Sequence, residues 1–148
     1  MLEEWSLPEF SDVAALVASE LITNSVLEIA KYAWAALPPV RLWLRGGRPG
    51  LAILVWDAIA AAPVPRTAGD DDESGRGLGI VADLSATCGF YHAAGPGGKV
   101  AWATLTNPVT HPGTHHAIRT NRNLAHRPTV FPGDMRLLSI RAVCEVDG

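Results

Sequence analysis

Cysteine is scarce in this 148-residue chain, where Cys88 and Cys144 are the only two and lie far apart. They form no C-x-x-C pair, so the sequence predicts neither a zinc ribbon nor a dithiol redox motif. His111 and His115 stand four residues apart in the tail, but a proline and a glycine lie between them. These two residues disfavour the helix that would bring both imidazoles to one metal ion, so we expect no zinc site there.

An excess of positive charge is also missing. The formal net charge is -3 at pH 7, which argues against a nucleic-acid partner, because such proteins usually carry a clustered positive face. The length fits about one domain with a sizeable core. A hydrophobic content of 48% opposes extensive disorder.

Uninterrupted apolar runs of membrane-spanning length are lacking as well. The apolar stretch from Val13 to Leu37 is broken by Glu20, Asn24, Glu28 and Lys31. The N-terminal stretch MLEEWSLPEF is acidic and has no continuous apolar core of a signal peptide. We therefore expect a cytoplasmic protein with no membrane partner.

The first long pattern in the chain is helical. Ser11 is predicted as the N-cap, Asp12 favours the helix dipole in the first turn, and Pro38 marks the end at the latest. The helical spacing is carried by Val13, Leu16, Val17 and Leu21.

Glu20 and Asn24 lie one turn apart on the apolar face of this predicted helix. A carboxylate and an amide beside a buried stripe are costly unless something binds them. The alternative is a boundary position from which both side chains reach solvent, as charged helix residues usually do.

The remaining strands are predicted from alternation and turn composition. The stretch VRLWL, the turn RGGRPG and the apolar run LAILVW indicate a hairpin whose second strand is central and ends on Asp57. That carboxylate either meets a ligand at the sheet edge or is a turn residue. GFYHA and VAWATL, joined by AGPGGK, predict a second hairpin, and MRLLSIRAVCEV predicts a terminal strand.

Glycines alternate just before another short apolar run. Gly75, Gly77 and Gly79 allow close backbone approach to a ligand, and a helix that begins there offers free N–H groups to phosphate. Plain turn glycines are the alternative. Arg76 would pair either with a phosphate or with the acid run 70–73, which we expect to be a solvated surface on a long loop.

Four segments, in order, resemble the Bergerat-type ATPase fold of anti-sigma-factor serine kinases and their actinobacterial relatives. SELITNSV is similar to the N-box ELVTNAV, and ESGRGLGIV is similar to the glycine box of that family. VWDAIAAAPVPR resembles its V-x-D-x-S-x-x-x-P segment, and GGKVAWATL resembles the closing strand GGKTVWAEL. The resemblance covers about residues 12–106, and the order and spacing make the motifs specific together.

The resemblance implies ATP and Mg²⁺ as cofactors and a role for each motif residue. Glu20 would be the general base for an attacking hydroxyl, Asn24 would give Mg²⁺ a side-chain oxygen, and Asp57 would accept a hydrogen bond from the adenine amino group. The phosphates would be wrapped by the glycine box, which consists of Ser74, Gly75, Arg76, Gly77, Leu78 and Gly79.

The resemblance also implies an α+β fold, a two-layer α/β sandwich with a mixed, mostly antiparallel sheet and helices on one face. The ATP-binding domain would span 1–107, and 108–148 would be an extension with a terminal strand. The family's first strand and most of its first helix have no counterpart before Ser11. The vacant sheet edge would be exposed, covered in a homodimer, or filled by the tail. Val100 stands where the family usually has a threonine that holds adenine through water, which predicts weaker affinity.

The function implied is a serine/threonine kinase that transfers the ATP γ-phosphate to an anti-sigma-factor antagonist, or that binds a sigma factor in its alternative state. The short N-terminus, Val100 and the unusual tail favour an alternative, a nucleotide-binding module without turnover that controls transcription by partner binding. The ATPase half of a histidine kinase is disfavoured, because no dimerisation helix or phosphoacceptor histidine segment precedes the N-box.

Overall fold

The computed structural model describes residues 2–33, 36–47, 50–63, 77–94, 97–106 and 136–142. A 3-10 turn, η1 (Pro8–Phe10), leads directly into the long helix α1 (Ser11–Ile29). The other elements are β1 (Val40–Gly47), β2 (Gly50–Asp57), α2 (Gly77–Leu84), β3 (Thr87–His92), β4 (Lys99–Thr106) and β5 (Arg136–Ala142). The fold class is therefore α+β, as the sequence predicted.

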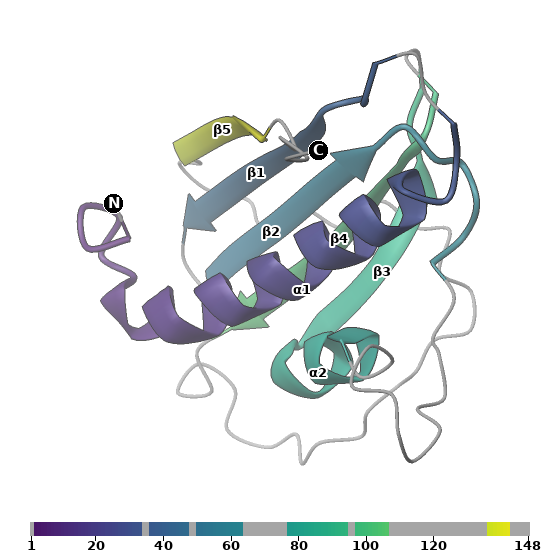
Figure 1. Ribbon diagram of the computed structural model, residues 1–148. Helices are drawn as coiled ribbons and strands as arrows, with labels where there is room; N and C mark the ends of the chain where they lie inside the picture. The colour runs from purple at the N-terminus through teal and green to yellow at the C-terminus, as the bar shows by residue number, and fades with distance from the viewer. Residues whose placement is uncertain are drawn as a thin grey trace.

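The five strands form one sheet in the order β3-β4-β2-β1-β5 (Figure 1). Both predicted hairpins are present: β1 pairs with β2, and β3 pairs with β4, each pair antiparallel. The other two pairs, β2 with β4 and β1 with β5, are antiparallel as well. The mixed component that we expected is thus not found among the described strands, because each neighbour in the sheet runs opposite to the next.

Helix α1 begins differently from the prediction. Ser11 is not the N-cap but the first helical residue, and Phe10 precedes it as N-cap without a side-chain cap hydrogen bond. The reason is that η1 continues directly into α1, so the residues at the junction already have helical backbone angles. Phe10 has φ -92° and ψ -3°, and Ser11 has φ -56° and ψ -50°. A side-chain cap needs an extended residue at that point. Phe10 is buried in the core instead.

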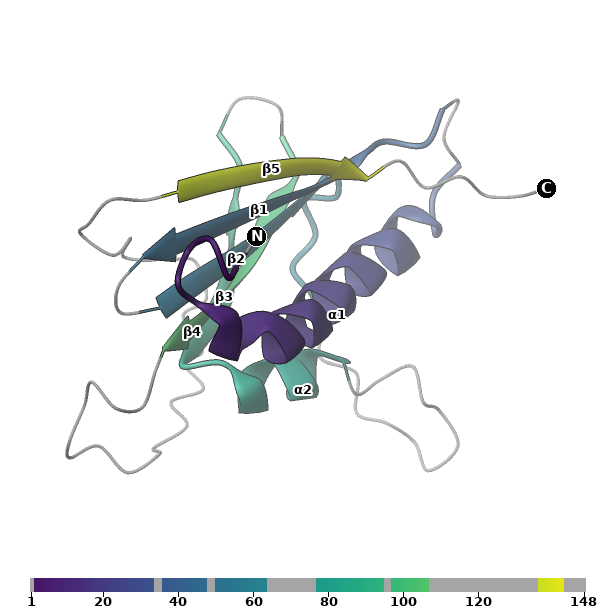
Figure 2. The same ribbon diagram turned by 90° about the vertical axis from the view of Figure 1, so that its left-hand side faces the viewer.

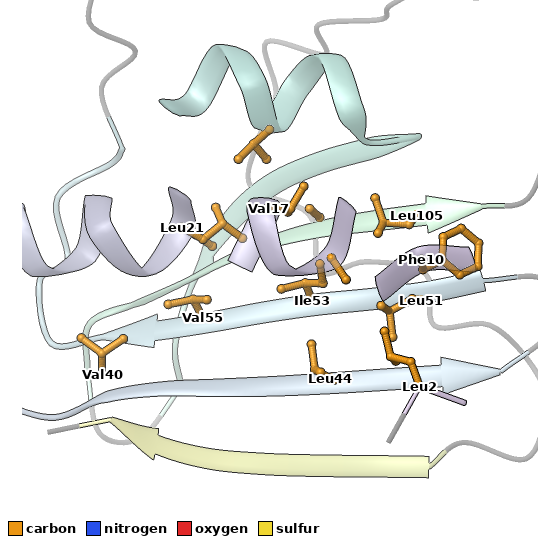
Figure 3. Close-up of a cluster of buried hydrophobic side chains, with 14 of the residues drawn as sticks. Leu2, Phe10, Val17, Leu21, Val40, Leu44, Leu51, Ile53, Val55 and Leu105 are labelled. Carbon is orange, nitrogen blue, oxygen red and sulfur yellow. The ribbon is translucent and has the colours of Figure 1, made fainter. Parts of the chain in front are cut away.

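Both helices lie on the same face of the sheet, which makes two layers (Figure 2). The buried residues of α1 recur every three or four positions and pack against the inward-facing residues of β2 (Figure 3). These α1 residues are Ala14, Val17, Leu21, Ser25 and Ile29. Strand β2 is buried along its whole length, as the apolar run predicted for a central strand.

The opposite face of the sheet carries a second apolar cluster. Its buried members come from the alternate positions of β2 and β4: Ala52, Leu54, Trp56, Val100 and Trp102. The indole Nε1 of Trp56 donates to the Gly97 carbonyl at 3.0 Å. The guanidinium of Arg41 lies over the Trp56 ring, 5.2 Å from its centroid.

Strand β5 lies at the edge of the sheet next to β1, with Val40 opposite Ala142 and Gly46 opposite Arg136. The terminal strand that the sequence predicted in the tail is therefore present, and it pairs with β1. The histidines and most of the arginines of the tail lie outside the described residues.

By length and apolar composition alone, the segment Pro8–Ile29 could cross a membrane, a test that core helices of soluble proteins also pass. In this fold its buried stripe contacts the sheet.

Candidate functional site

Helix α1 brings a hydroxyl to the end of the central strand. Ser25 continues the buried stripe of α1 and is 1% exposed. Its Oγ donates a hydrogen bond to Asp57 Oδ2 at 2.8 Å. The last residue of β2 is thus tied to the helix layer, which fixes where its carboxylate lies.

The carboxylate of Asp57 is fully buried and has three donors. Besides Ser25, the backbone N–H of Ile59 donates to Oδ1 at 2.9 Å. The ammonium of Lys99 also donates to Oδ1 at 2.9 Å and to the Ile59 carbonyl at 3.2 Å. Both charged side chains are 0% exposed. A buried charge needs such partners, since desolvation of an unpaired one is costly.

The sheet register makes this ion pair. Asp57 and Lys99 stand directly opposite each other as the end residues of β2 and β4. Gly98 precedes the lysine with φ +79°, and a Cβ built there would collide with the Asp57 carbonyl and lie 3.0 Å from Ala58 Cα. Only glycine lets the turn before β4 approach the end of β2 this closely.

Val100, which we expected to weaken the contact with adenine, does not face Asp57. It stands opposite Trp56 and belongs to the cluster on the far face of the sheet. Side chains alternate along a strand, so Lys99 and Ala101 point to the helix side. The residue that meets Asp57 is therefore Lys99.

A second polar contact joins α1 to the start of α2. Glu20 is half-buried. A Cβ built on Gly77 would collide with Glu20 Oε2, so the carboxylate lies directly against the first residue of α2. A negative charge is favourable there, because the N-terminus of a helix has free N–H groups and a positive dipole end. The structure thus brings Glu20 next to Gly77, two residues that the sequence placed in different motifs.

The other predicted residues have different outcomes. Asn24 lies on α1 between Glu20 and Ser25 and is half-buried. Leu78 packs against the core, and Gly79 is exposed with nothing within 4 Å of a Cβ built on it. Ser74, Gly75 and Arg76 lie outside the described residues.

Sequence reasoning missed Lys99 and Ser25. Lysine occurs only twice in the chain, at positions 31 and 99, and the second opens the apolar strand KVAWATL. A lysine at the start of a central strand needs a buried acceptor, and this signal could have found it. Ser25 stands four residues after Leu21 and four before Ile29, so its place on the buried stripe was readable from the spacing.

Chemically, the site has two polar poles on one helix. The Glu20 carboxylate lies at the start of α2, and the Asp57 carboxylate lies beside Ser25. Ser25 lies five positions after Glu20 in the α-helix, which is about 7.5 Å along the axis. One pole offers a carboxylate next to anion-binding N–H groups, and the other offers an acceptor for a donor group. Among the described residues no group of three or more His, Cys, Asp or Glu could hold a metal ion.

Comparisons of the chain with models of protein families, with curated proteins and with solved structures found no match.

Proposed function

We propose that this chain is a Bergerat-type ATP-binding regulator, similar to the anti-sigma-factor serine kinases, that transfers the γ-phosphate of ATP to a serine or threonine of a partner protein. The observation that supports it most is that α1 carries both poles, with Glu20 against Gly77 and Ser25 on Asp57. Motifs far apart in the chain thus meet along one helix, as a single nucleotide pocket requires.

The start of α2 suits the phosphates. Its first-turn N–H groups have no partner within the helix, and they favour an anion. Gly79 is exposed, with open space around its Cβ position, so phosphate oxygens have room to approach the backbone. Asn24, one turn beyond Glu20, is an oxygen donor of the type that Mg²⁺ accepts alongside waters and phosphates. The metal would neutralise phosphate charge.

Glu20 is proposed as the general base. Its carboxylate is half-buried rather than sealed in the core, so a partner hydroxyl has access to it. Its place beside the start of α2 puts it next to the proposed phosphate site. A candidate general base is judged first by whether it lies within reach of the reacting hydroxyl, and only then by its basicity. Asp57 would accept the adenine amino group through the remaining lone pair of Oδ2, because Ser25 uses only one.

One observation favours the second candidate, a nucleotide-binding module without turnover that acts by partner binding. The Asp57 carboxylate already has three donors and is 0% exposed, which leaves the proposed adenine subsite largely occupied by the protein itself. In both proposals the partner is an anti-sigma-factor antagonist or a sigma factor, and the protein is cytoplasmic.

The test uses Glu20→Gln with Asp12→Asn as its matched control, an exposed carboxylate in the first turn of the same helix. Calorimetry measures Mg-ATP binding, and phosphate release measures turnover with and without a candidate antagonist protein. We expect Glu20→Gln to keep ATP binding within about threefold but to lower turnover about 100-fold or more, in the range typical of a lost general base. Asp12→Asn should change neither. ATP binding without turnover in the wild type selects the module, and no binding at millimolar ATP refutes both.

Gly79→Ala tests the phosphate site separately. The added methyl group meets nothing in the free protein, and alanine favours a helix by about 0.5–1 kcal/mol over glycine. Stability should therefore be kept or raised, while Mg-ATP affinity falls because the methyl group blocks close approach of the phosphates. Unchanged affinity in this variant would place the phosphates elsewhere.

A further inference from the structure

Lys99 has no part in the proposed function, yet it is the side chain that holds Asp57. We propose that Lys99 sets the affinity of this protein for the nucleotide base: its ammonium neutralises the Asp57 carboxylate that the base would bind, and so weakens that carboxylate as an acceptor for the base. This inference rests on the proposed function and adds a residue to it, a positioning residue that acts through Asp57.

The hydrogen bonds around Asp57 determine how much of the acceptor remains for the base. A carboxylate has about four acceptor positions. Oδ1 already receives the Ile59 N–H and the Lys99 ammonium, and Oδ2 receives the Ser25 hydroxyl. Only one position on Oδ2 is left, and the whole pair is shut off from solvent. A base that brings an amino group to this carboxylate therefore has one acceptor position, on a carboxylate whose charge the Lys99 ammonium already neutralises.

The structure also gives the ammonium somewhere to go. Lys99 Nζ donates to the Ile59 carbonyl at 3.2 Å in addition to Asp57. An ammonium has three donors, so it can keep this second acceptor while its contact with Oδ1 lengthens. The contact with Oδ1 can thus lengthen by a shift of the lysine side chain, with the strands left in register. Lys99 would then lie beside the bound base, and its ammonium could donate to a ring nitrogen next to the amino group.

The ligand class follows from these groups. An acceptor beside a donor matches a base with an exocyclic amino group adjacent to an unprotonated ring nitrogen, as in adenine. Adenosine, which lacks phosphates, therefore reports the base subsite alone. Inorganic tripolyphosphate reports the phosphate site alone and should not respond to Lys99.

The experiment compares the wild type with Lys99→Met, which keeps the length of the side chain and removes the charge. The carboxylate retains two of its three donors in this variant. We expect affinity for adenosine and for Mg-ATP to rise at least tenfold, with tripolyphosphate affinity unchanged. Ser25→Ala is the matched control: it removes a donor from the same carboxylate but leaves Lys99, so the gain should be less than threefold. An equal gain in Ser25→Ala, or no gain in folded Lys99→Met, overturns the proposal.

A second measurement needs no variant of Lys99. The chain has only two lysines, so lysine labelled with ¹³C at the ε carbon gives two NMR signals, which Lys31→Arg assigns. Saturating adenosine should shift the Lys99 signal and leave the Lys31 signal in place, and an unmoved Lys99 signal overturns the proposal. If the wild type binds ATP but Lys99→Met binds no better, this inference fails and the proposed function stands. If neither binds ATP, both fail.

Discussion

Asp57 and Lys99 form an ion pair with both side chains fully buried, and a double-mutant cycle tests their coupling directly. The perturbations are Asp57→Asn, Lys99→Met and the two together. Asp57→Asn keeps the shape of the side chain but leaves the Lys99 charge with neutral acceptors only, in a place with 0% exposure. Breaking a buried pair by removing one charge costs about 3–5 kcal/mol.

The two single variants should differ in magnitude. Lys99→Met leaves the Asp57 carboxylate with two donors, the Ser25 hydroxyl and the Ile59 N–H, at 2.8 and 2.9 Å. We place its cost near the lower limit, at about 3 kcal/mol, and that of Asp57→Asn higher, at about 4 kcal/mol. In the double variant no charge remains: the amide oxygen accepts from the Ile59 N–H, and the amide NH2 donates to the Ser25 hydroxyl oxygen. Its cost should be about 1–2 kcal/mol, less than either single variant.

The assay is urea unfolding followed by circular dichroism, with equal slopes required across the set so that midpoints report stability. These costs give a coupling energy of about 5–6 kcal/mol in magnitude, because the double variant loses less than the sum of the two single variants. Lys31→Met is the control, because Lys31 pairs with Glu28 at an exposed position, where removal costs about 0.5 kcal/mol or less. A double variant that loses the sum of the two single costs would refute the coupled ion pair.

Three further predictions concern single residues. Gly98→Ala should lower the melting temperature more than Gly97→Ala: both have left-handed φ, at +79° and +74°, but only at Gly98 does a Cβ collide with backbone. The free energies of unfolding of the two variants should differ by at least about 1 kcal/mol. Equal losses of stability in both variants would contradict the contact at Gly98. Burial raises the pKa of the Cys88 thiol above its usual 9.0, so in a Cys144→Ser background iodoacetamide at pH 8 should react more slowly with native than with urea-unfolded protein. Because the folded pKa is raised, this thiol contributes stability that is lost as pH rises above about 9. Gly77→Ala should displace the carboxylate that α1 places against it, changing stability by about 1 kcal/mol or less but lowering ATP turnover; a loss of several kcal/mol in urea unfolding would mean that the carboxylate cannot move.

Much of the fold was predictable because its signals are local. The turn RGGRPG between alternating and apolar runs predicted the hairpin of β1 and β2, and AGPGGK predicted that of β3 and β4. Helical spacing predicted α1, and the apolar run LAILVW predicted a central strand ending at Asp57. Each of these signals depends on neighbours within a few residues, so it survives in the folded chain.

The start of α1 shows where local reasoning failed. Ser11 has a side chain suited to an N-cap, but the N-terminal segment enters the helix through η1 and buries Phe10. Packing of that ring in the core, with Leu2 and Leu7 in the same cluster, is a tertiary contact that the local cap preference could not anticipate. The same limit applies to the expected mixed sheet, since strand direction is decided by neighbours across the sheet.

The candidate site divides in the same way. From residue types and spacing alone, the chain specified a polar pair on the apolar side of a helix, an aspartate ending a buried strand and glycines opening a second helix. Only the tertiary structure decided that Glu20 lies against Gly77, and that Lys99, 42 residues away along the chain, neutralises Asp57. The physical reason is that strand register and helix placement select the partner of a buried charge, and both arise from long-range packing that no short stretch of sequence encodes.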